Sequence, residues 1–242
     1  MRKPIRLTIF IIVSLLCSFA VLNPLEYSYF KIENKNIPFL LLLLSALLIP
    51  MGLMLSSLFL RTKLKIENKI TFFGQNPKCC CLLLILPVLC LSIVGMHNNH
   101  GINPHLLGFF FGLVIMIYVL MEEYGWRGYL QEELAISNEW LRAIIIGAIW
   151  YLWHWSFVSN PDVKSNLIFL AVMIAGSLAI GKIADTTKSI AICGFAHAMG
   201  SISFTSPLIV NSIPLTKRLI IVSVCVITLI FMDKKWGLFS NK

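Results

Sequence analysis

Long apolar runs separated by short polar segments dominate this chain, and their lengths predict helices that cross a membrane. A transmembrane helix needs about 20 predominantly apolar residues. The runs that meet or approach this length cover residues 7–23, 38–60, 79–96, 106–134, 140–158, 166–183, 189–206 and 217–232. The pattern therefore predicts an all-α fold, a polytopic membrane helical bundle of about eight transmembrane helices.

The composition supports this interpretation. The chain has 242 residues, of which 58% are hydrophobic, and a mean hydropathy of +0.84. A soluble domain could not hide that much apolar surface. Because no long linker, repeat or soluble segment is apparent, we expect one integral membrane domain over residues 1–242, with its polar motifs in a core at 106–206.

Basic residues are distributed unevenly between the two sides of the predicted membrane. With the N-terminus inside, fifteen of the 20 Lys and Arg residues fall on inner segments, and the outer segments hold only Lys31, Lys35, Lys164, Lys217 and Arg218. This bias predicts that both termini are cytoplasmic. The formal charge of +9 is then a topology signal that favours contact with anionic membrane lipids. We expect no nucleic-acid partner, because no aromatic–basic binding module appears.

The apolar run 106–121 ends in Glu122-Glu123-Tyr124-Gly125-Trp126-Arg127. Ionisable side chains within a membrane span are costly and indicate function. Glu123 and Arg127 are four apart with the acid first, so they are expected to pair along one helix face. Glu122 lies about 100° round the helix and is left for chemistry. The polar stretch 131–133 is expected to project into the cytosol.

Two histidines interrupt later apolar runs. Trp150 shares a helix face with His154, and His197 shares one with Ser201, because each pair is four residues apart. Trp150, Trp153 and Trp155 are interpreted as interfacial anchors and packing residues without a chemical role.

Turn positions predict that these groups lie at compatible depths. Glu122 and His154 are each sixteen residues from Asn138, in the turn Ser137-Asn138, so a hairpin places both about 24 Å from that turn. His197 lies nine residues beyond the predicted turn at 185–188, about 13 Å into the bilayer. A hairpin that protrudes about 10 Å into the cytosol would bring them to one level.

A carboxylate, two imidazoles and a hydroxyl suit hydrolysis. The carboxylate can act as general base on water, and an imidazole and a neighbouring donor can stabilise a tetrahedral oxyanion. The alternative is a zinc site with Glu122, His154 and His197 as ligands and an activated water. These residues alone do not separate the two. A serine hydrolase fits less well, since no Gly-x-Ser-x-Gly element is present.

The order Glu-Glu-x-x-x-Arg, aromatic-x-x-x-His and His-x-x-x-Ser on successive spans resembles the CPBP family of intramembrane proteases. This family, also called Abi, comprises CAAX prenyl proteases and bacteriocin-processing proteins. The resemblance covers residues 122–201, and the N-terminal helices at 1–100 correspond to a region that varies in such proteins. It implies an integral membrane peptidase, in a bacterial plasma membrane, that acts on a peptide or lipidated-peptide substrate in peptide processing or bacteriocin self-immunity.

The resemblance also implies roles for individual residues. Glu122 would be the water-activating base assisted by His154, His197 would stabilise the oxyanion, and Glu123 and Arg127 would brace the site. The family's mechanism is described both as metal-free and as zinc-dependent. At position 201 the family usually has Asn, so Ser201 suggests a weaker enzyme or another donor such as Ser203. At position 150 Phe is commoner than Trp.

Two alternatives to an active protease remain open, and one loop has two possible interpretations. Ser201 favours a catalytically weak or inactive member that acts as a membrane scaffold or immunity protein. A transporter would use intramembrane charges, but no inverted repeat is apparent. The loop His97–His105, with its third histidine at His100, is either a solvated loop, which we favour, or a metal site. The seven cysteines are interpreted as buried small apolar residues.

Overall fold

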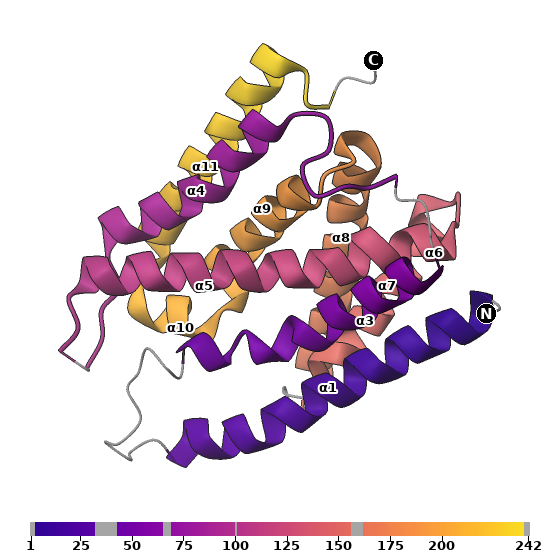
Figure 1. The fold of residues 1–242 in the computed structure, drawn as a ribbon. Helices are drawn as coiled ribbons and strands as arrows, with labels where there is room; N and C mark the ends of the chain where they lie inside the picture. The colour runs from indigo at the N-terminus through magenta and orange to yellow at the C-terminus, as the bar shows by residue number, and fades with distance from the viewer. Residues whose placement is uncertain (1–2, 32–42, 65–68, 100, 156–161, 240–242) are drawn as a thin grey trace. The chain divides into compact units, whose positions relative to one another are not determined.

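A computed structural model describes residues 3–31, 43–64, 69–99, 101–155 and 162–239, and helices form nearly all of its regular structure (Figure 1). Within these described residues, six helices are long and apolar enough to cross a membrane. They are Lys3–Ala20, Leu43–Thr62, Pro77–Val94, Pro104–Leu134, Val163–Thr187 and Leu215–Trp236. Two shorter helices, α7 (Glu139–Trp155) and α9 (Ile190–Gly200), occupy the two other predicted spans. The prediction of a polytopic helical bundle is confirmed, and the protein is an integral membrane protein.

The chain forms two compact units. The first contains Met1–Ile70 and Met121–Lys182, and the second contains Thr71–Leu120 and Ile183–Lys242. The prediction of a single domain over 1–242 is not tested by this division and stays a prediction. Residues 38–42 and 156–158 of the predicted spans, and His100 of the histidine loop, lie outside the described residues.

The first unit contains the acidic motif. Its helices are α1 (Lys3–Lys31), α3 (Leu48–Leu64), α7, and the parts of α5 (Pro104–Gly125) and α8 (Val163–Thr187) within its limits. After α5 the chain continues without a break as the π-helix η1 (Trp126–Gln131) and the short α6 (Glu132–Leu134). Helices α1 and α3 lie side by side in this unit (Figure 1).

The second unit contains the second histidine motif. Helix α9 leads into a second π-helix, η2 (Ser201–Thr205), followed by α10 (Pro207–Ser212) and α11 (Leu215–Trp236). Helix α4 (Pro77–Val94) packs against both α9 and α11 (Figure 1). One isolated β-bridge joins Thr71 to Ser189, the N-cap residue of α9.

Local signals set the helix starts as predicted. Asn138 Oδ1 accepts hydrogen bonds from the backbone N–H groups of Trp140 and Leu141, both at 3.0 Å, so the polar turn at 137–138 starts α7. The turn before α9 is shorter than the predicted 185–188. Helix α8 runs on to Thr187, and Lys188, with φ at 53°, reverses the chain.

The histidine loop is held by hydrogen bonds. His105 Nδ1 lies 2.9 Å from the carbonyl oxygen of Ser92, and the backbone N–H of His97 donates to the carbonyl of Ser212 at 3.2 Å. Both side chains are exposed, which agrees with a solvated loop. The cysteine interpretation holds for the buried Cys79, Cys80, Cys193 and Cys225, whereas Cys81 is exposed.

Helices α7 and α8 approach closely at a glycine, and this contact generates a stability prediction. A Cβ on Gly147 would lie 2.6 Å from Ile174 Cα, which is backbone and does not yield easily. Gly147→Ala should therefore lower the free energy of unfolding by about 1–3 kcal/mol. Gly176→Ala on the same helix pair is the control, because its Cβ would meet only Trp150 Cζ3 at 3.5 Å. Thermal unfolding in detergent measures both, and equal stability of the two variants would contradict the prediction.

Candidate functional site

Glu122 lies on the last turns of α5 and is 0% exposed. Its Oε2 atom accepts two indole hydrogen bonds, from Trp126 Nε1 at 3.2 Å and from Trp150 Nε1 at 2.9 Å. Trp126 is one turn along the same helix, and Trp150 comes from α7. Hydrogen bonds to an ionised acceptor are stronger than neutral ones, so these two donors orient the carboxylate within an otherwise apolar environment.

Aromatic rings surround this carboxylate. The Trp126 ring lies 6.4 Å from that of Trp150, 6.0 Å from that of Trp153 and 6.2 Å from that of Phe10, measured between centroids. Trp126, Trp153 and Phe10 are almost fully buried. Large rings packed at such distances leave the donors little rotational freedom. Trp126 and Trp150 therefore hold Glu122 in place, a role of Trp150 that its interpretation as a packing residue or anchor missed.

The predicted pairing of Glu123 with Arg127 is confirmed. The guanidinium Nη1 donates to the carboxylate at 3.1 Å, and both side chains are 0% exposed. The guanidinium carbon also lies 4.9 Å from the centre of a Trp150 ring. A cation over an indole face draws electron density from it, which strengthens the indole N–H as a donor. Arg127 thus links the structural acid Glu123 to the donor of Glu122.

His154 lies one turn along α7 from Trp150 and is half-buried. Its Nδ1 is 2.9 Å from the carbonyl oxygen of Trp150. A carbonyl only accepts, so Nδ1 is the donor in this bond. The ring packs edge-on against Trp153, at 5.0 Å, and Phe169, at 5.5 Å.

The hairpin register differs by one turn from the one predicted. The α5–η1–α6 helix ends at Leu134 and α7 begins at Glu139, with four turn residues between them. Glu122 is twelve residues before Leu134 and Trp150 is eleven after Glu139, so these two are level and bonded. Counting from Asn138 treated three turn residues as helix and therefore placed His154, rather than Trp150, opposite Glu122.

The second unit supplies the other predicted residues. His197 is half-buried on α9, and Ser201 is buried at the start of η2. The backbone N–H of Ser201 is shared between the carbonyls of Ala198 and His197. Ser203 Oγ donates to the carbonyl of Met199 at 2.7 Å, so its hydrogen is already used and it is a poor substitute oxyanion donor.

The acidic motif and the second histidine motif each run into a π-helix, which sequence reasoning missed. Helix η1 begins three residues after Glu123, and η2 begins four residues after His197. Such segments are rare and occur frequently at functional sites. No periodicity in the apolar pattern signals a local change of helix type, and the regularly spaced motif residues give no hint of it.

The stretch 131–133 does not project into solvent as predicted. Gln131 and Glu133 are buried, and Gln131 Nε2 donates to the carbonyl of Gly181 at 3.2 Å. Glu133 pairs with Arg6, and Glu132 pairs with Arg61 at 3.7 Å. The prediction was wrong because basic side chains from α1 and α3, distant in sequence, compensate the acids and allow their burial.

The zinc alternative stays a prediction for the part of the chain that the structure describes. No three His, Cys, Asp or Glu residues there are grouped as metal ligands. The first unit holds Glu122 and His154, whereas His197 belongs to the second. Glu122 Oε2 is already engaged by two indole donors.

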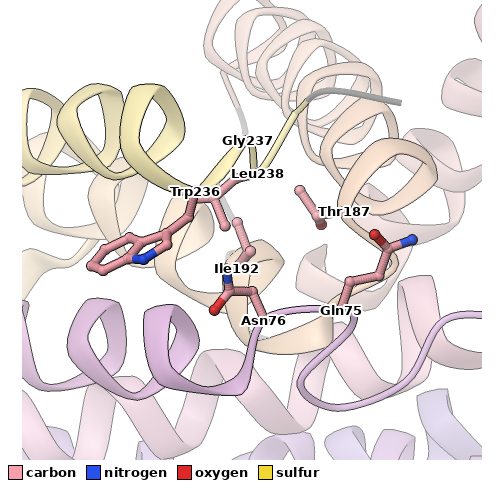
Figure 2. A pocket seen from close by; sticks show the side chains of 7 residues that line it. All are labelled: Gln75, Asn76, Thr187, Ile192, Trp236, Gly237 and Leu238. Carbon is pink, nitrogen blue, oxygen red and sulfur yellow. The ribbon is translucent and has the colours of Figure 1, made fainter. Parts of the chain in front are cut away.

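A hollow of about 200 Å³ lies in the second unit (Figure 2). Trp236, Gly237 and Leu238 lie on one side of it, and the polar side chains of Gln75, Asn76 and Thr187 approach it from the other (Figure 2). Neither His197 nor Ser201 is among its lining residues, so we assign it no role in the chemistry.

The part of the chain that contains the motifs matches a known protein family. Residues 103–203 match the family model described as Type II CAAX prenyl endopeptidase Rce1-like. This segment is similar to the Rce1-like domain that the model describes. The match confirms the resemblance seen in the motifs, and it contains all of the predicted site residues from Glu122 to Ser201. The Rce1-like family is a protease family. No curated protein matches the chain.

The Glu123–Arg127 pair generates a prediction about folding. Arg127→Met leaves the Glu123 carboxylate buried without its cation, and it should lower stability by about 3–5 kcal/mol. The double variant Glu123→Met/Arg127→Met removes both charges and should recover most of that loss. The fraction of monodisperse protein in detergent and its thermal midpoint measure the effect. A double variant less stable than Arg127→Met would contradict it.

Proposed function

We propose that this Rce1-like protein is a glutamate-dependent intramembrane endopeptidase of the CAAX-protease type. The observation that carries the proposal is a fully buried carboxylate, Glu122, oriented by two indole donors. A half-buried imidazole packs one turn away, at a centroid distance of 5.8 Å from Trp150.

The proposed reaction follows from these groups. Glu122 removes a proton from water, and the resulting hydroxide adds to the carbonyl carbon of the scissile peptide bond. His154 accepts a hydrogen bond from that water at Nε2, which orients its attack. His197 from the second unit, with Ser201, stabilises the oxyanion. Glu122 then returns its proton to the leaving nitrogen as the carbon–nitrogen bond breaks, so two peptide fragments leave and the carboxylate is regenerated.

We propose a peptide or lipidated peptide as the substrate, reached from the surrounding membrane lipid. The family description supports a substrate that ends in a prenylated CAAX sequence, and peptide processing and bacteriocin self-immunity are the roles that the motif resemblance implies. The charge bias supports a bacterial plasma membrane orientation with both termini in the cytoplasm. The substrate would then reach the inner half of the bilayer.

The first test is Glu122→Gln. This substitution keeps the side-chain shape and an oxygen that accepts from both indoles, but it removes the base. Peptide hydrolysis should fall by about 10²–10⁴-fold, with the protein still inserted and folded. Cleavage of prenylated reporter peptides by purified protein in lipid measures it. Wild-type rates in the variant would reject the glutamate mechanism.

Metal content is measured on the same sample. Zinc at one equivalent, lost together with activity on chelation, would replace the proposed mechanism by the zinc alternative, with Glu122, His154 and His197 as its ligands. Activity that survives chelation supports the metal-free reaction.

Ser201 favours a second candidate, a catalytically weak member that serves as a membrane scaffold or immunity protein. A serine hydroxyl is shorter than the asparagine amide common in the family, and Ser203 is engaged with Met199. Oxyanion donors are each worth about 10²–10³ in rate.

Ser201→Asn should therefore raise kcat, by about tenfold or more if Ser201 donates poorly. Ser201→Ala is the matched control and should lower kcat or leave it unchanged. A rate in Ser201→Asn equal to that of Ser201→Ala would show that position 201 does not contribute to the oxyanion.

A further inference from the structure

We infer that α1 and α3 hold the acidic motif in its catalytic position through two arginine–glutamate pairs, Arg6–Glu133 and Arg61–Glu132. Arg6 and Arg61 are thereby positioning residues of Glu122. Both arginines lie outside the family-matched segment 103–203. These two pairs are together called the clamp. The clamp is a property of the first unit, whereas its consequence for catalysis rests on the proposed function.

Arg6 forms an ion pair with Glu133, which lies just beyond the π-helix η1. Its Nε and Nη2 atoms both donate to Glu133 Oε1, the first at 2.9 Å. The Glu133 side chain is 4% exposed and that of Arg6 is 21% exposed. Lys3 Nζ, also on α1, donates to the carbonyl of Leu134 at 3.1 Å. Two donors on one buried carboxylate oxygen give a strong, geometrically defined contact.

Arg61 touches the motif helix on both sides of η1. On the N-terminal side its guanidinium carbon lies 5.2 Å from the centre of the Tyr124 ring, one residue after Glu123. On the C-terminal side its Nη2 is 3.7 Å from Glu132 Oε2. The backbone of Ile70 closes the arrangement, because its N–H donates to Glu132 Oε1 and its carbonyl accepts from Arg61 at 3.4 Å.

Helix α1 also contacts the π-helix between these points. Phe10 packs against Tyr129 at 4.8 Å and against Trp126 at 6.2 Å. Trp126 in turn donates to Glu122. Contacts therefore run from α1 through Phe10 and Trp126 to the proposed base, and from α3 through Arg61 to Tyr124.

The clamp matters because a π-helical segment is less favourable than a continuous α-helix and is therefore rare. The contacts at residues 124, 132 and 133 stabilise the π-helical form of Trp126–Gln131. A misplacement of about 1 Å can cost about 10²-fold in rate. Loss of the clamp should therefore lower turnover before it affects substrate binding.

The first arm of the test needs no activity. Hydrogen exchange is followed by mass spectrometry on the full chain in lipid nanodiscs, for Arg6→Met, Glu133→Gln and the double variant. Exchange of the amides in 126–134 should rise about tenfold or more in each single variant, since hydrogen bonds to charged groups are among the stronger ones in proteins. The double variant should show no more than the larger single effect, because the two residues act as one pair.

Lys182→Met and Glu139→Gln are the matched controls. These residues form another ion pair of the first unit, at 3.0 Å, but their side chains are 51% and 41% exposed, and exposed pairs contribute little. Exchange in 126–134 should be unchanged in both. Arg6→Lys covers the case in which Arg6→Met does not fold. It keeps the charge, loses the two-pronged donor, and should raise exchange in 126–134 by a smaller factor.

The second arm is kinetic. With a prenylated reporter peptide, kcat should fall about tenfold in Glu133→Gln and Arg6→Met, and KM should stay within about twofold because substrate contacts are unaltered. Exchange in 126–134 that stays at the wild-type level in Arg6→Lys and Glu133→Gln overturns the clamp. So does a rise that extends evenly over the whole first unit, or single effects that multiply in the double variant. Altered exchange in a chain whose wild type cleaves nothing rejects the proposed function and leaves the clamp standing.

Discussion

The burial of charge constrains the rest of this structure. Glu122, Glu123 and Arg127 are each 0% exposed within an apolar helix bundle, where an uncompensated charge costs several kcal/mol. Each is compensated by a different device. Glu123 has a cation four residues away, Arg127 has in addition the face of Trp150, and Glu122 has the N–H groups of two indoles. The Glu122 carboxylate is thus held in place by hydrogen bonds from two neutral donors.

Trp150 gains significance from this arrangement. The family more often has Phe at the corresponding place, and a phenyl ring would supply the surface under Arg127 but no donor for Glu122. In this chain the indole does both. The residue that looked like a minor departure from the motif is therefore a chain-specific part of the carboxylate's environment. Ser201 is the opposite case, because nothing among the described contacts replaces the longer amide.

The parts of the site that could be predicted are local in sequence. The Glu123–Arg127 pair follows from spacing within one helix, and the start of α7 follows from the capping side chain of Asn138. Contacts between distant segments could not be predicted from one sequence. The partner of Glu133 is 127 residues away, and that of Trp150 is 28 residues away across a turn. The one-turn register error arose at that turn, where Ala135 adopts a left-handed backbone with φ at 52° and the helix ends earlier than the polar residues suggest.

Arginines from outside the family-matched segment contact η2 and the residues that flank η1. In the first unit, Arg6 and Arg61 contact the residues that flank η1. In the second unit, the buried Arg218 of α11 donates to the carbonyl of Ser203 inside η2, and to that of Ile213 at 3.1 Å. All three arginines lie outside residues 103–203. The family-matched segment thus contains η1 and the start of η2, and arginines from helices outside that segment contact the flanks of η1 and the interior of η2. These helices supply positive charge at the contact points, because the carboxylates and carbonyls that they meet are buried and need a partner.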